Sequence, residues 1–328
     1  MMPHCYDAPM EISNARTITW NDSATREKGL SLLGWLEGVP RALGAFERVT
    51  FAYIAWLNTI VIVFHRNIAH PARCFMIHVA IGLGIAWLSR SAARSPNSAL
   101  RFARHWYPLP LYIFFFEELE GLVHIIFPGW FDRWLISFDY NLVGVYPSVW
   151  LARFAGPALN DFMQFAYMTY FLYLVILPAI LYSQRERLAY WTVMVSTAIA
   201  QYSVYVIAVL LPIESPYHAF VSFRQKPLTG GPFTATIDMI ERFARVHGAA
   251  FPSAHVAGSM VAVLASWRYR RWLFWICLPF FLSMCVATVY GRYHYIADVL
   301  AGIAVGTAGF FAGDSLMRRK GVLPPIAE

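Results

Sequence analysis

The chain has 328 residues, of which 58% are hydrophobic and only 14% are charged, with a formal net charge of +7. Soluble domains carry about 25% charged residues, so this composition excludes an ordinary soluble protein. The positive charge falls in short arginine clusters between apolar runs, which is typical of membrane topology signals and excludes a nucleic-acid-binding surface.

Apolar runs of nearly bilayer-crossing length recur along the chain, and they lack the alternation of a membrane barrel. We therefore predict an all-α, polytopic membrane bundle of about six to eight transmembrane helices. In chain order the candidate spans are residues 49–64, 73–89, 107–127, 160–182, 190–212, 253–267, 272–290 and 295–315.

Two segments depart from this pattern. Residues 131–158 mix aromatic and charged residues with Gly and Pro, which predicts one or two amphipathic helices at the membrane interface. Candidate span 107–127 contains FFFEELEGLVHIIF, whose three acids are too many for lipid. We favour a re-entrant or interfacial helix there, with its acids in water, and Glu120 and His124 have the spacing of a helical pair.

The arginine clusters predict the orientation of the chain. With eight spans and a cytoplasmic N-terminus, all four clusters and both termini are cytoplasmic. Loop 213–252 and the turn at 291–294 then lie on the extracytoplasmic side. The predicted parts are a tail (1–48), N-terminal membrane helices (49–128), a membrane core (129–315) and a second tail (316–328). The clusters are Arg90, Arg94, Arg101 and Arg104; Arg185 and Arg187; Arg268, Arg270 and Arg271; and Arg318, Arg319 and Lys320.

Two histidines open apolar spans on that predicted extracytoplasmic side. His294 stands four residues before Asp298 in YHYIAD, a spacing that places both on one helix face. Asp298 can accept a hydrogen bond from one ring nitrogen of His294, which leaves the other nitrogen as a nucleophile or base. In AAFPSAHVAG, Pro252 suits the first turn of a helix, Ser253 and free amides hold a phosphate oxygen, and His255 protonates a departing oxygen. Together they predict a phosphoryl-transfer site.

Such a site needs cations around the phosphate. Arg292, two residues before the nucleophile, is the first candidate. Arg224 and Lys226 lie in the same predicted extracytoplasmic loop, in SFRQKPLTGGPF, and a solvated loop is the alternative for these two.

FPSAHVAGS and YHYIADVLAG resemble the second and third signature motifs of the type 2 phosphatidic acid phosphatase superfamily. Their form is similar to that of the inositol phosphorylceramide synthase-like branch. LPIESPY and FDYNLVGVYPSVWLARFAGP resemble upstream segments of that branch, so the similarity extends over roughly residues 130–310.

The resemblance implies a six-helix phosphatase-type core and a metal-independent lipid phosphatase or phosphotransferase with a phosphohistidine intermediate. It implies His294 as nucleophile, Asp298 as its orienting acid and His255 as general acid. Ser253 helps to hold the phosphate. Hydrolysis and transfer of a phosphorylated head group, as in inositol phosphorylceramide synthases, both stay open.

This sequence departs from the family pattern at the cationic positions. The first motif, Lys followed after six residues by Arg-Pro, is not present, and Lys226-Pro227 is at best a relic of it. Ala287 and Thr288 stand where the third motif usually carries Ser-Arg. Arg292 is the proposed replacement.

Two other classes of function stay open. In a bis-histidine membrane haem protein, His255 and His294 are axial ligands and Asp298 supports one of them, with His78 as a third intramembrane candidate. In a non-enzymatic transporter or scaffold, the acidic segment 117–124 is the site of interest. For the enzyme we expect no cofactor, no metal and no nucleic acid, with a lipid phosphate or phospholipid substrate and the bilayer as partners. The sequence does not indicate an oligomeric state.

Overall fold

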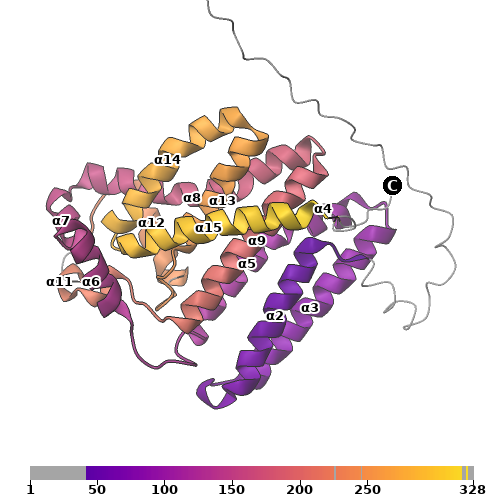
Figure 1. Ribbon diagram of the computed structural model, residues 1–328, viewed down its shortest axis with the longest axis horizontal. Helices are drawn as coiled ribbons and strands as arrows, with labels where there is room; N and C mark the ends of the chain where they lie inside the picture. The colour runs from indigo at the N-terminus through magenta and orange to yellow at the C-terminus, as the bar shows by residue number, and fades with distance from the viewer. Residues whose placement is uncertain (1–41, 225–226, 245, 320–322, 324–328) are drawn as a thin grey trace, which may run out of the picture.

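The computed structural model describes residues 42–224, 227–244, 246–319 and 323, which form helices joined by turns with no β-strand among them. Six helices are long and apolar enough to cross a membrane, and each coincides with a predicted span. This confirms the all-α polytopic bundle (Figure 1). The six are α2 (Ala45–Val63), α3 (Pro71–Arg94), α8 (Pro157–Ser183), α9 (Arg187–Leu210), α14 (Arg271–Tyr290) and α15 (Ile296–Met317).

Helix α9 forms the centre of the bundle, with most of its side chains buried, and α2, α8, α13 (Ala254–Tyr269) and α15 pack on it. Helix α15 approaches its neighbours through glycines. A Cβ on Gly302 would stand 2.8 Å from the Ser253 carbonyl oxygen, and one on Gly309 would stand 2.8 Å from the Ala200 Cβ. Small residues of this kind let helix backbones pack closely in a membrane.

The predicted span 253–267 corresponds to α13, which is shorter than the six. Its 16 residues extend about 24 Å, against a hydrocarbon core of about 30 Å. It packs between α8, α9, α14 and α15.

Segment 107–127 is not one continuous helix. Helix α5 (Pro108–Glu118) passes into a 3₁₀ turn, η2 (Leu119–Gly121), and then into irregular turns. The predicted Glu120–His124 pair does not form, because Glu120 accepts from the His247 amide at 2.6 Å. Nor do all three acids face water: Glu118 Oε1 lies 2.6 Å from Nε2 of the fully buried His78, on α3.

The predicted interfacial segment contains two helices, α6 (Asp132–Val143) and α7 (Pro147–Leu151), and a 3₁₀ turn η3 (Ala152–Phe154). Helix α6 buries Asp132 and Asp139 while Trp134 is 69% exposed and Phe138 47% exposed. An apolar outer face suits contact with lipid. The position of this segment at the membrane surface stays a prediction. The remaining helices are η1 (His65–Asn67), α4 (Ser98–Trp106), α10 (Pro216–Ala219), α11 (Val221–Arg224) and α12 (Pro232–Ala244).

The described arginine clusters gather at one end of the bundle, near α4, whereas α6, α7 and α12 lie at the other (Figure 1). Ion pairs tie arginines of these clusters to neighbouring helices: Arg268 lies 3.3 Å from Asp314 of α15, and Arg104 lies 3.0 Å from Glu47 of α2. This arrangement agrees with the charge pattern from which the orientation was predicted. Lys320, residues 1–41 of the first predicted tail and most of the second tail lie outside the described residues.

Candidate active site

His294 lies in the turn before α15, two residues ahead of the first helical residue. Its Nδ1 is 2.8 Å from the Ala250 carbonyl oxygen and 3.2 Å from Asp298 Oδ2. The predicted contact with Asp298 is present, but the helix-face argument for it was wrong. Asp298 is the third residue of α15, and its Oδ2 also accepts from the Tyr295 amide at 2.8 Å in a capping box.

These contacts assign the tautomer of His294. Both partners of Nδ1 are acceptors, so Nδ1 carries the proton and Nε2 keeps its lone pair. The residue is 6% exposed, and it lines a cavity. The arrangement leaves one nucleophilic nitrogen for a group bound in that cavity.

His255 is the second residue of α13, and its ring centroid lies 6.2 Å from that of His294. The rings of Tyr167 and Tyr170 lie close to the His255 ring, with centroids at 4.6 and 4.4 Å from it. An anionic phosphate bound beside this ring would favour its protonation.

The predicted place of Pro252 in the first helical turn was wrong, because α13 begins at Ala254 with Ser253 as its N-cap. The Ser253 hydroxyl accepts from the Val256 amide at 3.4 Å, and the Ser253 amide donates to the Asp298 carbonyl oxygen at 3.1 Å. This second bond ties the start of α13 to the start of α15. It brings the two histidines to one side of the bundle.

The Pro-rich stretch at 211–217 holds the other side of the His294 turn. The Ile213 amide donates to Gly248, and the Ala250 amide donates to Ile213, both at 3.2 Å. These two hydrogen bonds orient the Ala250 carbonyl group, whose oxygen accepts the hydrogen bond from His294 Nδ1. The Tyr217 amide donates to the Arg292 carbonyl oxygen at 3.0 Å.

Two functional residues that sequence reasoning missed come from α6. Asp139 accepts from the amides of Ile296 and Ala297, at 2.8 and 3.0 Å, and so caps α15 from a distant part of the chain. Asp132 accepts from the Tyr295 hydroxyl at 2.7 Å. Burial raises the pKa of both carboxyl groups, and their hydrogen bonds oppose that rise. Their seven-residue spacing on an aromatic helix was the available signal.

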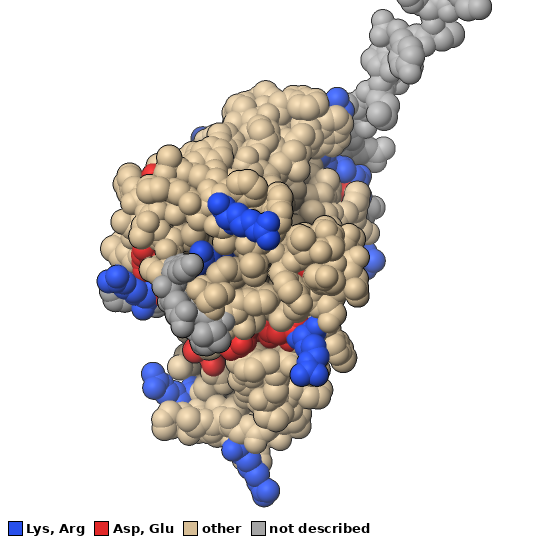
Figure 2. All heavy atoms as spheres, turned by 90° about the vertical axis from the view of Figure 1, so that its left-hand side faces the viewer, with Lys and Arg blue, Asp and Glu red and all other residues tan. Residues whose placement is uncertain are grey.

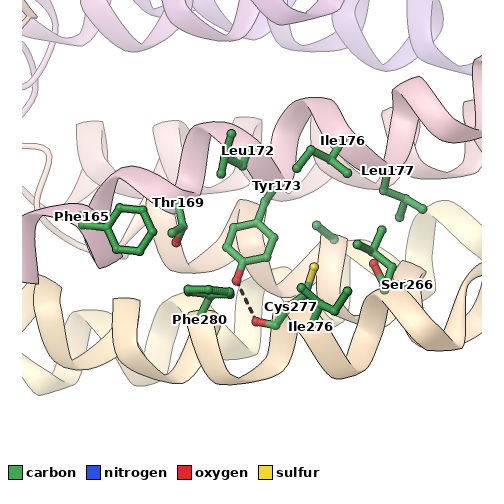
Figure 3. A pocket seen from close by; sticks show the side chains of 12 residues that line it. Phe165, Thr169, Leu172, Tyr173, Ile176, Leu177, Ser266, Ile276, Cys277 and Phe280 are labelled. Carbon is green, nitrogen blue, oxygen red and sulfur yellow. Dashed lines mark hydrogen bonds between the residues drawn. The ribbon is translucent and has the colours of Figure 1, made fainter. Parts of the chain in front are cut away.

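The histidine pair lines a cavity of about 520 Å³ between α5, α8 and α12. Its wall is mainly apolar and aromatic. Three of the lining residues are also exposed at the outer surface of the protein: Ile113 (57% exposed), Phe171 (39%) and Val175 (42%). A smaller apolar cavity of about 120 Å³ lies between α8 and α14, where the Tyr173 hydroxyl donates to the Cys277 carbonyl oxygen at 2.8 Å (Figure 3). Neither histidine lines this second cavity.

A family model described as the PAP2 superfamily matches residues 133–312, more than half of the chain. The protein belongs to the PAP2 superfamily. Neither the curated proteins nor the solved structures contain a match. Membership in this superfamily indicates an enzyme of the phosphatase type, and together with the six apolar helices it indicates an integral membrane protein. The resemblance to the inositol phosphorylceramide synthase branch is not confirmed.

The predicted phosphate ligands of this PAP2 protein do not all reach the cavity. Ser253 is fully buried, and its hydroxyl caps α13. Arg292 is 4% exposed, donates to the Phe223 carbonyl oxygen at 3.2 Å and stacks 4.3 Å from the Phe223 ring. Neither residue lines the cavity. Lys226 and the side chain of Arg224 lie outside the described residues. A phosphate-binding role for these four residues stays a prediction.

Proposed function

We propose that this protein is a metal-independent lipid phosphatase or lipid phosphotransferase that forms a phosphohistidine at His294 on the extracytoplasmic face of the membrane. The observation that carries the proposal is the hydrogen bonding of His294. Its Nδ1 is held by the Ala250 carbonyl oxygen and by Asp298, which leaves Nε2 for the cavity shared with His255.

The first step forms a P–N bond between Nε2 of His294 and the phosphorus, and the P–O bond to the leaving group breaks. His255, protonated once the phosphate is bound, gives its proton to the departing oxygen. Asp298 stabilises the positive charge that develops on the His294 ring. In the second step the oxygen of water or of an alcohol attacks phosphorus, the P–N bond breaks, and His255 takes the proton of the attacking group.

The shape of the cavity supports a lipid substrate. Ile113, Phe171 and Val175 line it and are also exposed at the surface of α5 and α8. In a membrane such apolar residues face the hydrocarbon, so a lipid chain enters sideways between these two helices. Superfamily membership favours phosphoester chemistry over haem binding for the histidine pair. The arginine clusters at the opposite end of the bundle support an extracytoplasmic site.

The direct test uses protein purified in detergent with EDTA present. Phospholipids and lipid phosphates are offered, and free phosphate, phosphorylated lipid and protein-bound phosphate are measured. We expect turnover and an acid-labile, base-stable protein phosphate in the wild type, and neither in His294→Ala. His70→Ala is the matched control, because His70 is exposed at the start of α3. Full turnover by His294→Ala, or a wild-type activity that EDTA abolishes, would refute the proposal.

The orientation has its own test. In a cysteine-free background, single cysteines at Asp238 of α12 and at Arg318 after α15 are treated in intact cells with a membrane-impermeant thiol reagent. Both positions are exposed, and they lie at opposite ends of the bundle. We expect labelling at position 238 and none at 318. The reverse pattern would place the site on the cytoplasmic side.

A further inference from the structure

One wall of the active-site cavity comes from outside the region that matches the family model. Helix α5 precedes residue 133, where the match begins. It nevertheless supplies five lining residues, spaced to follow one face of the helix. They are Leu109, Tyr112, Ile113, Phe116 and Glu117. This part of the chain therefore shapes a binding site whose catalytic groups belong to the superfamily core.

Two carboxylates line this otherwise apolar and aromatic cavity. Glu117 comes from the end of α5, and Glu241 comes from α12. Glu241 lies beside the Tyr293 phenol, whose pKa is raised by burial and next by this carboxylate. The Tyr293 ring stacks on Tyr167 at 4.6 Å, and Tyr167 in turn flanks His255. Glu241 is thus close to the centre where the phosphate is expected.

The described charged residues that line the cavity are both acidic, which disfavours binding of a substrate that carries only negative charge. None of the described residues that line it is Lys or Arg. Figure 2 views the end of the molecule that carries α6, α7 and α12, and it shows a band of acidic side chains on that face, with Lys and Arg side chains around it. A bare phosphate monoester brings negative charge towards carboxylates, and such like-charge contacts oppose binding. A head group that carries a positive charge of its own would offset these contacts.

We propose that Glu117 and Glu241 form a subsite for an ammonium group, so that the preferred substrate is a lipid phosphodiester with an amine-bearing head group. The carboxylates pair with the ammonium, and the rings of Tyr112, Phe116 and Tyr293 offer cation–π contacts. The inference rests on the proposed function, because it places the amine beside the phosphate that His294 attacks. A P–N bond to His294 forms and the P–O bond to the lipid alcohol breaks, so the phosphoryl group with its amine-bearing head group stays on His294. The departing lipid oxygen takes the proton from His255.

Binding and turnover are measured separately. Lipids with identical chains and a phosphoethanolamine, phosphoglycerol or phosphate monoester head group are titrated, and apparent Kd is read from thermal shift. Wild type, His294→Ala, Glu117→Gln and Glu241→Gln are compared. Asp238→Asn is the matched control, because Asp238 is an exposed acid on the same helix as Glu241 and does not line the cavity. Glu117→Lys is a second variant, in which the charge of the subsite is reversed.

We expect the wild type and His294→Ala to bind the phosphoethanolamine lipid most tightly. Each Glu→Gln variant should weaken that binding about tenfold to a hundredfold, as expected for loss of a charged hydrogen bond, and should change the other two lipids less than twofold. Glu117→Lys should favour the monoester. Equal binding of all three lipids by the wild type, tighter binding of phosphoglycerol, or unchanged Glu→Gln variants would overturn the inference.

The two proposals fail in different ways. Amine-selective binding without turnover of any lipid contradicts the phosphohistidine chemistry and supports the ammonium subsite. Turnover that depends on His294 but ignores the head group contradicts the subsite alone.

Discussion

The cap that Asp139 places on α15 gives the sharpest test of how the site is held. In Asp139→Ala the amides of Ile296 and Ala297 lose their acceptors in a partly buried place. Each orphaned donor costs about 1–3 kcal/mol. Burial raises the pKa of this carboxyl group, which means that burying its charge is itself unfavourable. Asp139→Ala removes that charge, and this offsets part of the cost of the lost hydrogen bonds. We therefore expect a net loss of about 2–4 kcal/mol in the free energy of unfolding.

Asp139→Asn distinguishes the effect of the lost hydrogen bonds from the effect of the lost charge. Its single oxygen still accepts from one amide, so we expect it to lose about 1 kcal/mol. Thermal unfolding in detergent measures both variants, and activity is measured at a temperature where both are folded. Activity should fall further than the folded fraction, because Asp298 lies in the turn that Asp139 caps and holds His294. Ser137→Ala, exposed on the same helix, is the control. Wild-type stability and activity in Asp139→Ala would refute the reasoning.

Two further outcomes are expected. Asp298→Asn should lower kcat by roughly two to four orders of magnitude with little change in lipid binding, because a neutral amide does not stabilise the positive charge that develops on the His294 ring; an unchanged kcat would contradict this. Gly306→Ala should cost about 1–3 kcal/mol in thermal unfolding because α13 is in the way, whereas Gly84→Ala, which meets open space, should cost nothing.

Features that depend on residues close together in the sequence could be predicted. Six of the eight spans predicted from the apolar runs are helices long enough to cross a membrane, and the four-residue interval predicted the contact between His294 and Asp298. The reason given for that contact was wrong, since His294 precedes the helix and the capping turn brings the pair together. A turn and a helix face can give the same spacing, so spacing alone does not distinguish them.

Contacts between distant parts of the chain could not be predicted in this way. Asp139 and Ile296 are 157 residues apart, and no interval within either motif points to the other. Arg292 shows the converse error. Its closeness to His294 in sequence suggested a phosphate ligand, but its φ of +68° turns the chain, and its guanidinium group packs on Phe223. Closeness in sequence fixes the backbone position and leaves the side-chain direction open.

The same contacts separate the two parts of the proposed site, the histidine pair and the wall proposed to meet the head group. The histidine pair is positioned by backbone: Ser253 bonds to the Asp298 carbonyl oxygen, and Gly302 lets α15 approach the start of α13. Helix α5 takes no part in those bonds; it packs on α9 and presents one face to the cavity. Substitution of Glu117 therefore alters the wall that the head group meets without moving His255 or His294. A chain built in this way can change the lipid it selects while its phosphoryl-transfer geometry stays fixed.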